Sequence, residues 1–211
     1  GLDASSTYEA QVAALCDPTD LETLSEYSAS INFTTACGVI SSLNENFDAV
    51  ASGTGNVLPL CWSYINTSTS SSYNYYPRVY NSSYSANSGI NCLQFYSYYS
   101  SSTDYDPRDQ YAILPEFTSV SDKRIKLNAR AYSTGSSYDA TFIVGVLTDP
   151  ADAATFVAID TLCPASTTYE PFLVALNSYT GEGKYIAFKI QAAYSTTASY
   201  CYRALYIDDV V

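Results

Sequence analysis

Eleven short segments, in which apolar and aromatic residues alternate with polar ones or form β-branched runs, limit what this chain of 211 residues can fold into. A period of two places successive side chains on opposite faces of a strand, whereas a helix needs a period near 3.6. Gly, Asn, Asp, Ser and Pro turn signals separate the segments. The pattern predicts an all-β sandwich with strands at Tyr8–Leu15, Ser30–Thr35, Cys61–Ile65, Cys92–Tyr99, Tyr111–Phe117, Arg124–Tyr132, Thr141–Leu147, Thr155–Thr161, Tyr169–Leu176, Lys184–Ala192 and Cys201–Val210.

Helical patterning is scarce in this chain. Asp17–Tyr27 is the only longer candidate helix, and Ala151–Ala154 is a candidate single turn after a proline. The single tryptophan, Trp62, stands beside a predicted strand, and a lone tryptophan in an all-β chain is most often a core anchor. We therefore expect Trp62 to be buried between two packed sheets.

The net charge of the chain limits which classes of partner it can bind. The net charge is −12, the sequence pI is about 4.1, and only nine residues are Lys or Arg. A phosphate-binding face needs clustered cations, so we expect no nucleic-acid partner. No apolar run approaches the roughly 20 residues that cross a bilayer, so we expect no membrane insertion.

The residue types needed for most hydrolytic chemistry are missing. The chain has no histidine, which excludes Ser/His/Asp and Cys/His arrangements, and it has no GxSxG, P-loop or dinucleotide motif. A glycosidase pair drawn from acids such as Glu116, Asp139 and Glu170 stays formally open, although such acids are usually solvated on the surface. We expect a protein that is not an enzyme.

Six cysteines without histidine or a CxxC pair argue against zinc. An even number of cysteines in an acidic, Ser/Thr-rich chain instead indicates disulfides and an oxidising, extracellular compartment. The alternative is six buried free thiols.

Two low-complexity stretches, Asn66–Tyr76 and Tyr96–Asp106, are rich in Tyr, Ser and Thr. Tyrosine offers a flat apolar ring and one hydroxyl at low entropic cost, and binding sites often lie on loops. One hypothesis is a ligand-binding surface that stacks aromatic faces on sugars or other rings; the alternative is that the tyrosines only cover the sandwich. The expected contacts are Tyr73, Tyr75, Tyr76, Tyr98, Tyr99 and Tyr105.

Residues Gly1–Gly38 resemble the last two strands of a fibronectin type III domain. Leu2 and Tyr8 stand at the positions of its tyrosine corner, and Ile31–Gly38 resembles its final strand. The earlier strands of such a domain are absent from the segment. The resemblance implies a partial fibronectin-like segment at residues 1–38.

From about Ile40 onward the chain resembles the jelly-roll modules of Bacteroidetes surface proteins, the cleaved-adhesin or choice-of-anchor J group found in gingipain adhesin regions. The resemblance implies a jelly-roll β-sandwich at residues 39–211. It is carried by Glu45–Asp48, Leu58–Trp62, Tyr111–Phe117, Val144–Thr161, Gly183–Lys189 and Tyr206–Val210.

This resemblance also implies a function. It points to a non-catalytic adhesion or recognition module of a large bacterial cell-surface protein, whose partner is a host or cell-surface protein, a glycan, or neighbouring copies of itself. One alternative is a structural subunit of an extracellular fibre or surface layer that docks by strand addition. Another is a carbohydrate-targeting module of a secreted enzyme, because fold alone does not choose among these roles.

The resemblance of residues 1–38 to fibronectin type III strands also implies one cysteine pair. The two fibronectin-like strands are neighbours in that fold, so Cys16 is expected to pair with Cys37. The remaining pairs are predicted as Cys61 with Cys92 and Cys163 with Cys201, out of fifteen pairings.

A structural calcium ion is the last expectation. The expected ligands are Glu45 and Asp48 near the first strand of the module and Asp208 or Asp209 in its last, because these strands can be neighbours in a jelly roll. Calcium takes six to eight oxygen ligands, so backbone carbonyls, Asn or water would complete the shell. In the alternative, Asp208 and Asp209 alternate across the strand, one solvated and the other accepting backbone hydrogen bonds.

Overall fold

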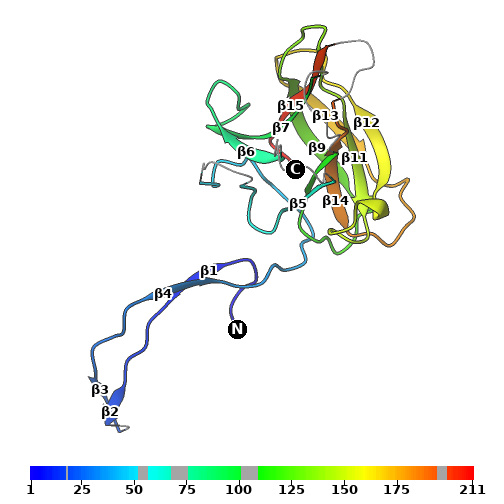
Figure 1. Ribbon diagram of the computed structural model, residues 1–211. Helices are drawn as coiled ribbons and strands as arrows, with labels where there is room; N and C mark the ends of the chain where they lie inside the picture. The colour runs from blue at the N-terminus through cyan, green and yellow to red at the C-terminus, as the bar shows by residue number, and fades with distance from the viewer. Residues whose placement is uncertain (18, 52–56, 68–75, 101–108, 194–198) are drawn as a thin grey trace. The chain divides into compact units, whose positions relative to one another are not determined.

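A computed structural model describes the chain except for residues 18, 52–56, 68–75, 101–108 and 194–198 (Figure 1). The chain divides into two compact units, residues 1–38 and residues 39–211. Apart from the 3-10 turn η1 (Ala153–Thr155), every regular element in the described part is a strand. None of the described helical structure is long and apolar enough to span a membrane.

The unit of residues 1–38 is an antiparallel two-stranded ribbon (Figure 1). Strand β1 (Thr7–Ala10) pairs with β4 (Ile31–Thr34), and β2 (Leu15–Asp17) pairs with β3 (Asp20–Leu24). The predicted helix at residues 17–27 is therefore wrong. Asp17 Oδ1 accepts hydrogen bonds from the backbone N and Oγ1 of Thr19 at 2.9 and 2.7 Å, which closes an Asx turn and returns the chain along β2.

Tyr8 makes the contact expected of a tyrosine corner. Its hydroxyl accepts a hydrogen bond from the backbone N of Asp3 at 2.7 Å, and its ring stacks on Phe33 at 5.9 Å between centroids. The fibronectin type III assignment itself stays a prediction, since a two-stranded ribbon occurs in many all-β folds.

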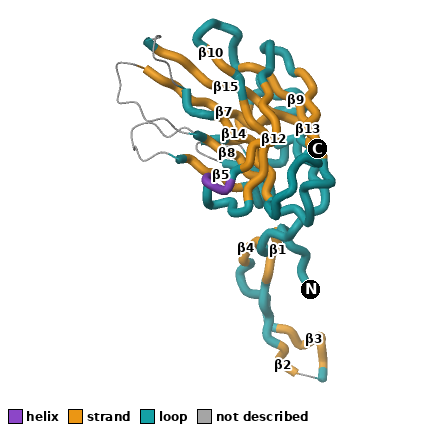
Figure 2. The backbone as a smooth tube through the Cα atoms, turned by 90° about the vertical axis from the view of Figure 1, so that its right-hand side faces the viewer, coloured by secondary structure: helices purple, strands orange, loops and turns teal. Residues whose placement is uncertain are grey.

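The unit of residues 39–211 consists of two mainly antiparallel sheets (Figures 1 and 2). One sheet has the order β13 (Glu170–Ala175), β9 (Arg124–Ala131), β15 (Tyr200–Asp208), β7 (Asn91–Ser100) and β6 (Arg78–Asn81), and β10 (Tyr138–Asp139) pairs in parallel with β15. The other has the order β12 (Val157–Leu162), β11 (Phe142–Leu147), β14 (Tyr185–Ile190), β8 (Gln110–Ile113) and β5 (Ser63–Asn66). The chain crosses repeatedly between the sheets, which confirms the predicted all-β jelly-roll sandwich.

The core lies between the two sheets. Trp62 is 8% exposed and lies edge-on to Phe47 at 5.7 Å, with Phe188 of β14 at 6.3 Å, which confirms it as a core anchor. In β15, Leu205 and Ile207 belong to the same buried cluster. Strand alternation therefore turns the residues between and before them, including three tyrosines of β15, to the outer face of the six-stranded sheet.

The predicted disulfide pairs are wrong. Cys37 and Cys61 are the disulfide-bonded cysteines, whereas Cys16, Cys92, Cys163 and Cys201 are free thiols. The strand register explains the first error, because Cys16 lies near the β2–β3 turn while Cys37 follows β4 at the other end of the ribbon.

The other two expected pairs fail for similar reasons. Cys92 is buried on β7, where its Sγ lies 3.8 Å from the carbonyl of Tyr80 and burial raises its pKa to about 12. Cys163 follows β12 in the five-stranded sheet, whereas Cys201 is on β15 in the six-stranded sheet.

Candidate functional site

Three tyrosines stand side by side on the outer face of the six-stranded sheet. Tyr202 of β15 is in register with Tyr98 of β7 on one side and with Tyr138 of β10 on the other. The ring centroids are 4.9 Å apart for Tyr98 and Tyr202 and 4.5 Å apart for Tyr202 and Tyr138. These distances match the spacing of neighbouring strands, roughly 4.8 Å, so the rings form a row across the strands. Figure 2 shows β10, β15 and β7, the three strands that carry the row.

The row continues along the sheet as a chain of aromatic contacts. Tyr138 stacks on Tyr132 at 5.8 Å, Tyr132 stacks on Tyr206 at 5.8 Å, and Tyr206 lies 5.9 Å from Tyr80. Each contact has the distance of a favourable ring pair. We call this set the tyrosine ladder, and its members are Tyr98, Tyr202, Tyr138, Tyr132, Tyr206 and Tyr80.

The small side chain of Ala204 leaves room for two tyrosine rings to contact each other above the sheet. Ala204 lies between Tyr202 and Tyr206 on β15 and is in register with Tyr96 of β7. Because Ala204 fills little space, Tyr96 and Tyr132 meet above this position, edge to face, at 5.8 Å. A larger side chain at position 204 would separate these two rings.

Arg130 fixes one end of the ladder. Its guanidinium carbon lies 4.4 Å from the Tyr206 ring centroid and 5.5 Å from that of Tyr169, within cation–π range. The guanidinium also donates to the backbone carbonyls of Tyr84, Ser85, Ala131 and Thr167. Tyr206 is only 4% exposed, so Arg130 and the surrounding residues cover this ring.

The other end of the ladder is open. Tyr132 is 40% exposed, and Tyr98, Tyr138 and Tyr202 are partly exposed. The nearby ion pair of Arg203 with Asp139 occupies the positions next to this row, which alternation places on the opposite face of the sheet. The open end therefore presents tyrosine rings without a charged neighbour on the same face among the described residues.

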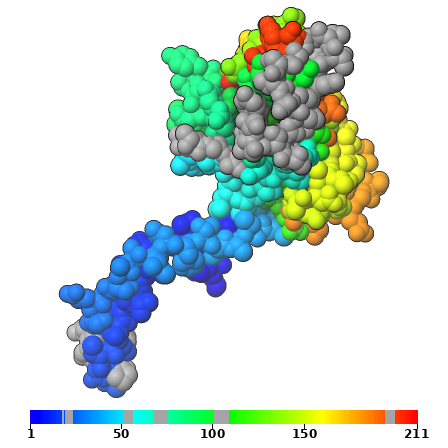
Figure 3. Space-filling model, in the orientation of Figure 1, coloured from blue at the N-terminus to red at the C-terminus, as the bar shows by residue number. Residues whose placement is uncertain are grey.

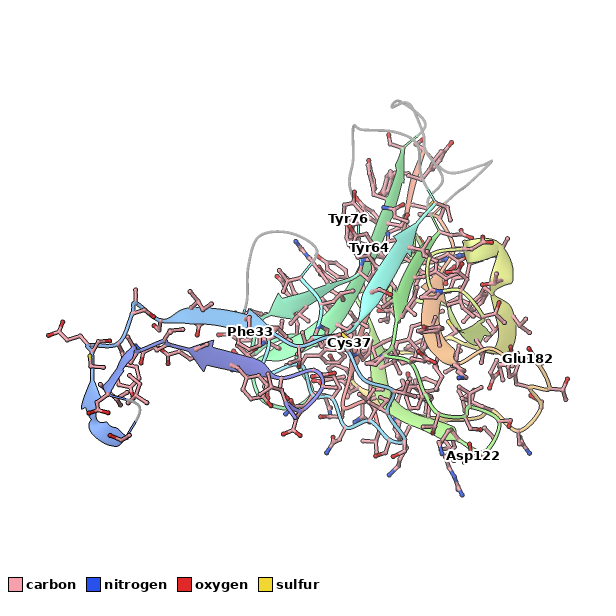
Figure 4. All side chains as sticks on the ribbon, turned by 90° about the horizontal axis from the view of Figure 1, so that it is seen from below. Phe33, Cys37, Tyr64, Tyr76, Asp122 and Glu182 are labelled. Atoms are coloured by element: carbon pink, nitrogen blue, oxygen red, sulfur yellow. The ribbon has the colours of Figure 1, made fainter. Side chains whose placement is uncertain are left out.

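The structure divides the predicted ligand-binding tyrosines. Tyr98 belongs to the ladder, whereas strand alternation places its neighbour Tyr99 on the other side of β7. Tyr76 contacts Tyr64 of β5, in the other sheet, with 5.1 Å between ring centroids (Figure 4). Tyr73, Tyr75 and Tyr105 lie outside the described residues.

Sequence reasoning missed most of the ladder. Its members outside the low-complexity stretches are Tyr80, Tyr132, Tyr138, Tyr202 and Tyr206. The period-two spacing of Tyr200, Tyr202 and Tyr206 was the available signal, because it places all three on one face of a strand. Nothing local places Tyr138 beside them.

The acids expected to bind calcium meet around one loop. Asp208 Oδ2 accepts hydrogen bonds from the backbone N of Asn87 and Ser88 at 2.7 and 3.2 Å, and Asp209 Oδ1 accepts one from Ser88 Oγ at 2.6 Å. Asp48 Oδ1 accepts from the backbone N of Ile90 and Asn91 at 2.8 and 3.0 Å. These bonds tie the first and last segments of the unit to residues 87–91.

Among the described contacts, Glu45 makes none with the loop of residues 87–91 that the three aspartates share. Its Oε1 accepts a hydrogen bond from the backbone N of Phe47 at 2.6 Å, and its backbone pairs with Val210. Within the described part of the chain, no group of three or more His, Cys, Asp or Glu is placed to hold a metal ion. In this structure the carboxylates of Asp48, Asp208 and Asp209 accept hydrogen bonds from N–H and O–H donors.

Calcium binding stays a prediction from the resemblance, and thermal melts test it. The hypothesis expects calcium to raise the melting midpoint relative to excess chelator, because a ligand bound only by the folded state stabilises it by about 2.7 kcal/mol at 100 times its Kd. The same comparison in Asp48→Asn should show no shift. Equal wild-type midpoints, together with no metal in elemental analysis, would contradict the hypothesis.

The candidate glycosidase acids do not meet. Glu116 pairs with Lys184 at 3.3 Å, Asp139 pairs with Arg203, and Glu170 accepts a hydrogen bond from the backbone N of Ala165 at 2.7 Å. Each of the three acids has a different partner, so the structure shows no carboxylate pair among them.

A shallow groove runs along the edge strand β12. It is lined by Thr148, Val157, Ala158, Ile159 and residues 178–182. Figure 3 shows the two segments side by side in yellow and orange. Glu182 is the single charged residue of this lining, and the groove lacks the ordered array of polar and aromatic groups found on the ladder.

The arrangement defines a β-sandwich with an ordered aromatic face and no catalytic constellation among the described residues. No protein-family model and no curated protein matches the chain by sequence. Solved structures do resemble it. The K2 cleaved adhesin domain of Lys-gingipain has a TM-score of 0.56 and 16% identity, covering 80% of this chain and 95% of that one.

Two further structures show the same fold. The K3 cleaved adhesin domain of Lys-gingipain from Porphyromonas gingivalis has a TM-score of 0.54 and 19% identity, covering 82% of this chain and 97% of that one. A structure described for carbohydrate-binding modules of the β-sandwich superfamily has a TM-score of 0.50 and 10% identity, covering 97% of this chain and 73% of that one. The chain therefore shares its fold with these adhesin domains and carbohydrate-binding modules.

Proposed function

We propose that this chain is a non-catalytic recognition module of an extracellular cell-surface protein and that it binds glycans through the open end of the tyrosine ladder. The observation that carries the proposal is the row of Tyr98, Tyr202 and Tyr138, whose rings contact one another in register on an open sheet face. The adhesin and carbohydrate-binding folds that the chain resembles support a binding role.

Contacts among the tyrosine rings themselves order this face of the sheet. Aromatic side chains usually pack into a core, and a contiguous exposed patch on a soluble protein often marks an interaction site. Here the rings hold one another in place, so a ligand meets them already ordered. Binding then costs little further side-chain entropy, which favours affinity.

An extracellular location has separate support. The chain is strongly acidic, and Cys37 and Cys61 are disulfide-bonded, as expected in an oxidising compartment. The partner in this proposal is a glycan on a host cell or another cell surface, carried by a lipid, a protein or a polysaccharide. A carbohydrate-targeting module of a secreted enzyme would use the same surface, and a catalytic domain in the parent chain would identify that role.

Single substitutions in the open row test the proposal. Tyr202→Ala and Tyr138→Ala are expected to weaken binding to glycans retained by the wild type at least tenfold, because central aromatic contacts in interfaces cost about 2 kcal/mol or more. Tyr84→Ala is the matched control, since this tyrosine is 96% exposed and outside the ladder. Glycan arrays followed by calorimetry provide the measurement, and unchanged affinity in both ladder variants would refute the proposal.

A structural subunit of a fibre or surface layer is the second candidate. It is favoured by the ribbon of residues 1–38, which leaves Val12 and Ile31 exposed at 74% and 66%. A two-stranded ribbon is only marginally stable alone, and an added strand or sheet would cover such residues. Concentration-dependent assembly in sedimentation experiments favours this role, and a monomer that binds glycans favours recognition.

A further inference from the structure

We infer that the ladder recognises an uncharged saccharide chain through the hydroxyl-bearing edges of its tyrosines, and that the ring faces are not the contact surface. The inference rests on the proposed function and specifies the class of ligand. It also departs from the stacking of sugars on aromatic faces that tyrosine-rich sequences suggest.

Both faces of the central ring of the row, that of Tyr202, are already covered by its neighbours. Tyr98 covers one side of Tyr202 at 4.9 Å, and Tyr138 covers the other at 4.5 Å with an interplanar angle of 10°. Strands β7 and β10 flank β15 on opposite sides, so the two contacts cover opposite faces of the central ring. A sugar cannot stack on a ring whose two faces are both covered.

The hydroxyl groups are available instead. Within the described part of the chain, the hydroxyls of Tyr98, Tyr132, Tyr138 and Tyr202 form no hydrogen bond. Burial among neighbouring rings raises the pKa of Tyr202, so its hydroxyl stays protonated and can both donate and accept. These properties match the hydroxyl groups of a sugar.

The charges around the open end favour a neutral ligand. Among the described residues, the cations that contact the ladder are Arg130 and Arg78, both at its Tyr206–Tyr80 end. Arg130 is committed to four backbone carbonyls, and Arg203 is paired with Asp139 on the opposite face. An acidic glycan would need such cations as partners, and it would also be repelled by a chain of net charge −12.

The register gives the ligand a direction. The row of Tyr98, Tyr202 and Tyr138 runs across the strands and repeats with the strand spacing of roughly 4.8 Å. One pyranose unit of an extended chain advances by a similar length. An extended saccharide lying across β7, β15 and β10 therefore places consecutive sugar units at consecutive hydroxyl groups.

Tyr→Phe substitutions separate edges from faces, because phenylalanine keeps the ring and removes the hydroxyl. The probes are neutral linear cello-, xylo- and manno-oligosaccharides of two to six units, and oligogalacturonates as acidic counterparts. In calorimetry we expect Tyr202→Phe and Tyr138→Phe each to weaken binding of the neutral probe about three- to tenfold, the usual effect of one lost hydrogen bond. Tyr84→Phe should bind like the wild type, and unchanged melting midpoints will show that each variant is folded.

The outcomes distinguish this inference from the proposed function. If Tyr202→Phe binds like the wild type while Tyr202→Ala does not, the faces carry the contact and the inference is overturned, although the proposed function stands. Tighter binding of oligogalacturonates, or binding that weakens with salt, overturns the uncharged ligand class. If neither these probes nor any glycan on an array binds the wild type, the proposed function itself fails.

Discussion

Replacing Phe188 with alanine is expected to lower the free energy of unfolding by about 3–5 kcal/mol, the usual cost of truncating a fully buried aromatic side chain. Phe188 lies in β14 and has no exposed surface. Its ring centroid lies 6.3 Å from that of Trp62 and 6.4 Å from that of Phe142. Removing the ring therefore leaves a cavity between the two sheets. The expected loss is a large fraction of the stability of an ordinary domain.

Urea unfolding followed by tryptophan fluorescence measures this effect, because Trp62 is the only tryptophan and contacts the altered position. Tyr84→Ala is the control, since truncating an exposed side chain usually changes stability by less than about 0.5 kcal/mol. A loss below about 1 kcal/mol in Phe188→Ala would show that the sheets do not pack around this ring.

The second large effect concerns pH and Asp208. This side chain has no exposed surface, and burial raises its pKa to about 6, although three backbone N–H groups donate to it. An unfolded chain would protonate it near pH 4, so between about pH 4 and 6 the folded protein binds more protons. The contribution of Asp208 to stability is therefore largest below this window and falls as pH rises through it, by at most about 3 kcal/mol.

Other acids modify this dependence. Burial also raises the pKa of Glu45, which acts in the same direction. Hydrogen bonds lower the pKa of Asp209, and hydrogen bonds from Thr141 and Arg203 lower the pKa of Asp139. The stability that these two carboxylates contribute to the fold is therefore lost only as pH falls below about 4. The decline in stability above pH 5 is thus expected to come mainly from Asp208.

Asp208→Asn isolates this contribution, because the amide does not titrate. Urea unfolding at a series of pH values between 4 and 7 should show a decline up to about pH 6 for the wild type and a much flatter profile for Asp208→Asn. Asp160→Asn, at an exposed acid of β12, should keep the wild-type profile. Parallel profiles for the wild type and Asp208→Asn would contradict the assignment.

The sequence by itself determined the strands and their faces. Alternation is a local property, so it gave the positions of β7, β9, β11 and β15 to within a few residues and placed Trp62 in the core. Its failures had local causes as well. The pattern missed strand β6, because four residues are too few to show alternation. It also suggested a helix after Asp17, where an Asx turn instead reverses the chain.

Only the tertiary structure decided which strands became neighbours, and the candidate site depends on that choice. Tyr138 and Tyr202 are 64 positions apart in the chain, yet they stack because β10 pairs with β15 in one register. A shift of one residue would turn Tyr202 to the other face and disperse the row. The cysteine pairing was decided in the same way, since register and sheet order are set by packing between distant segments, which leaves no local signal in the sequence.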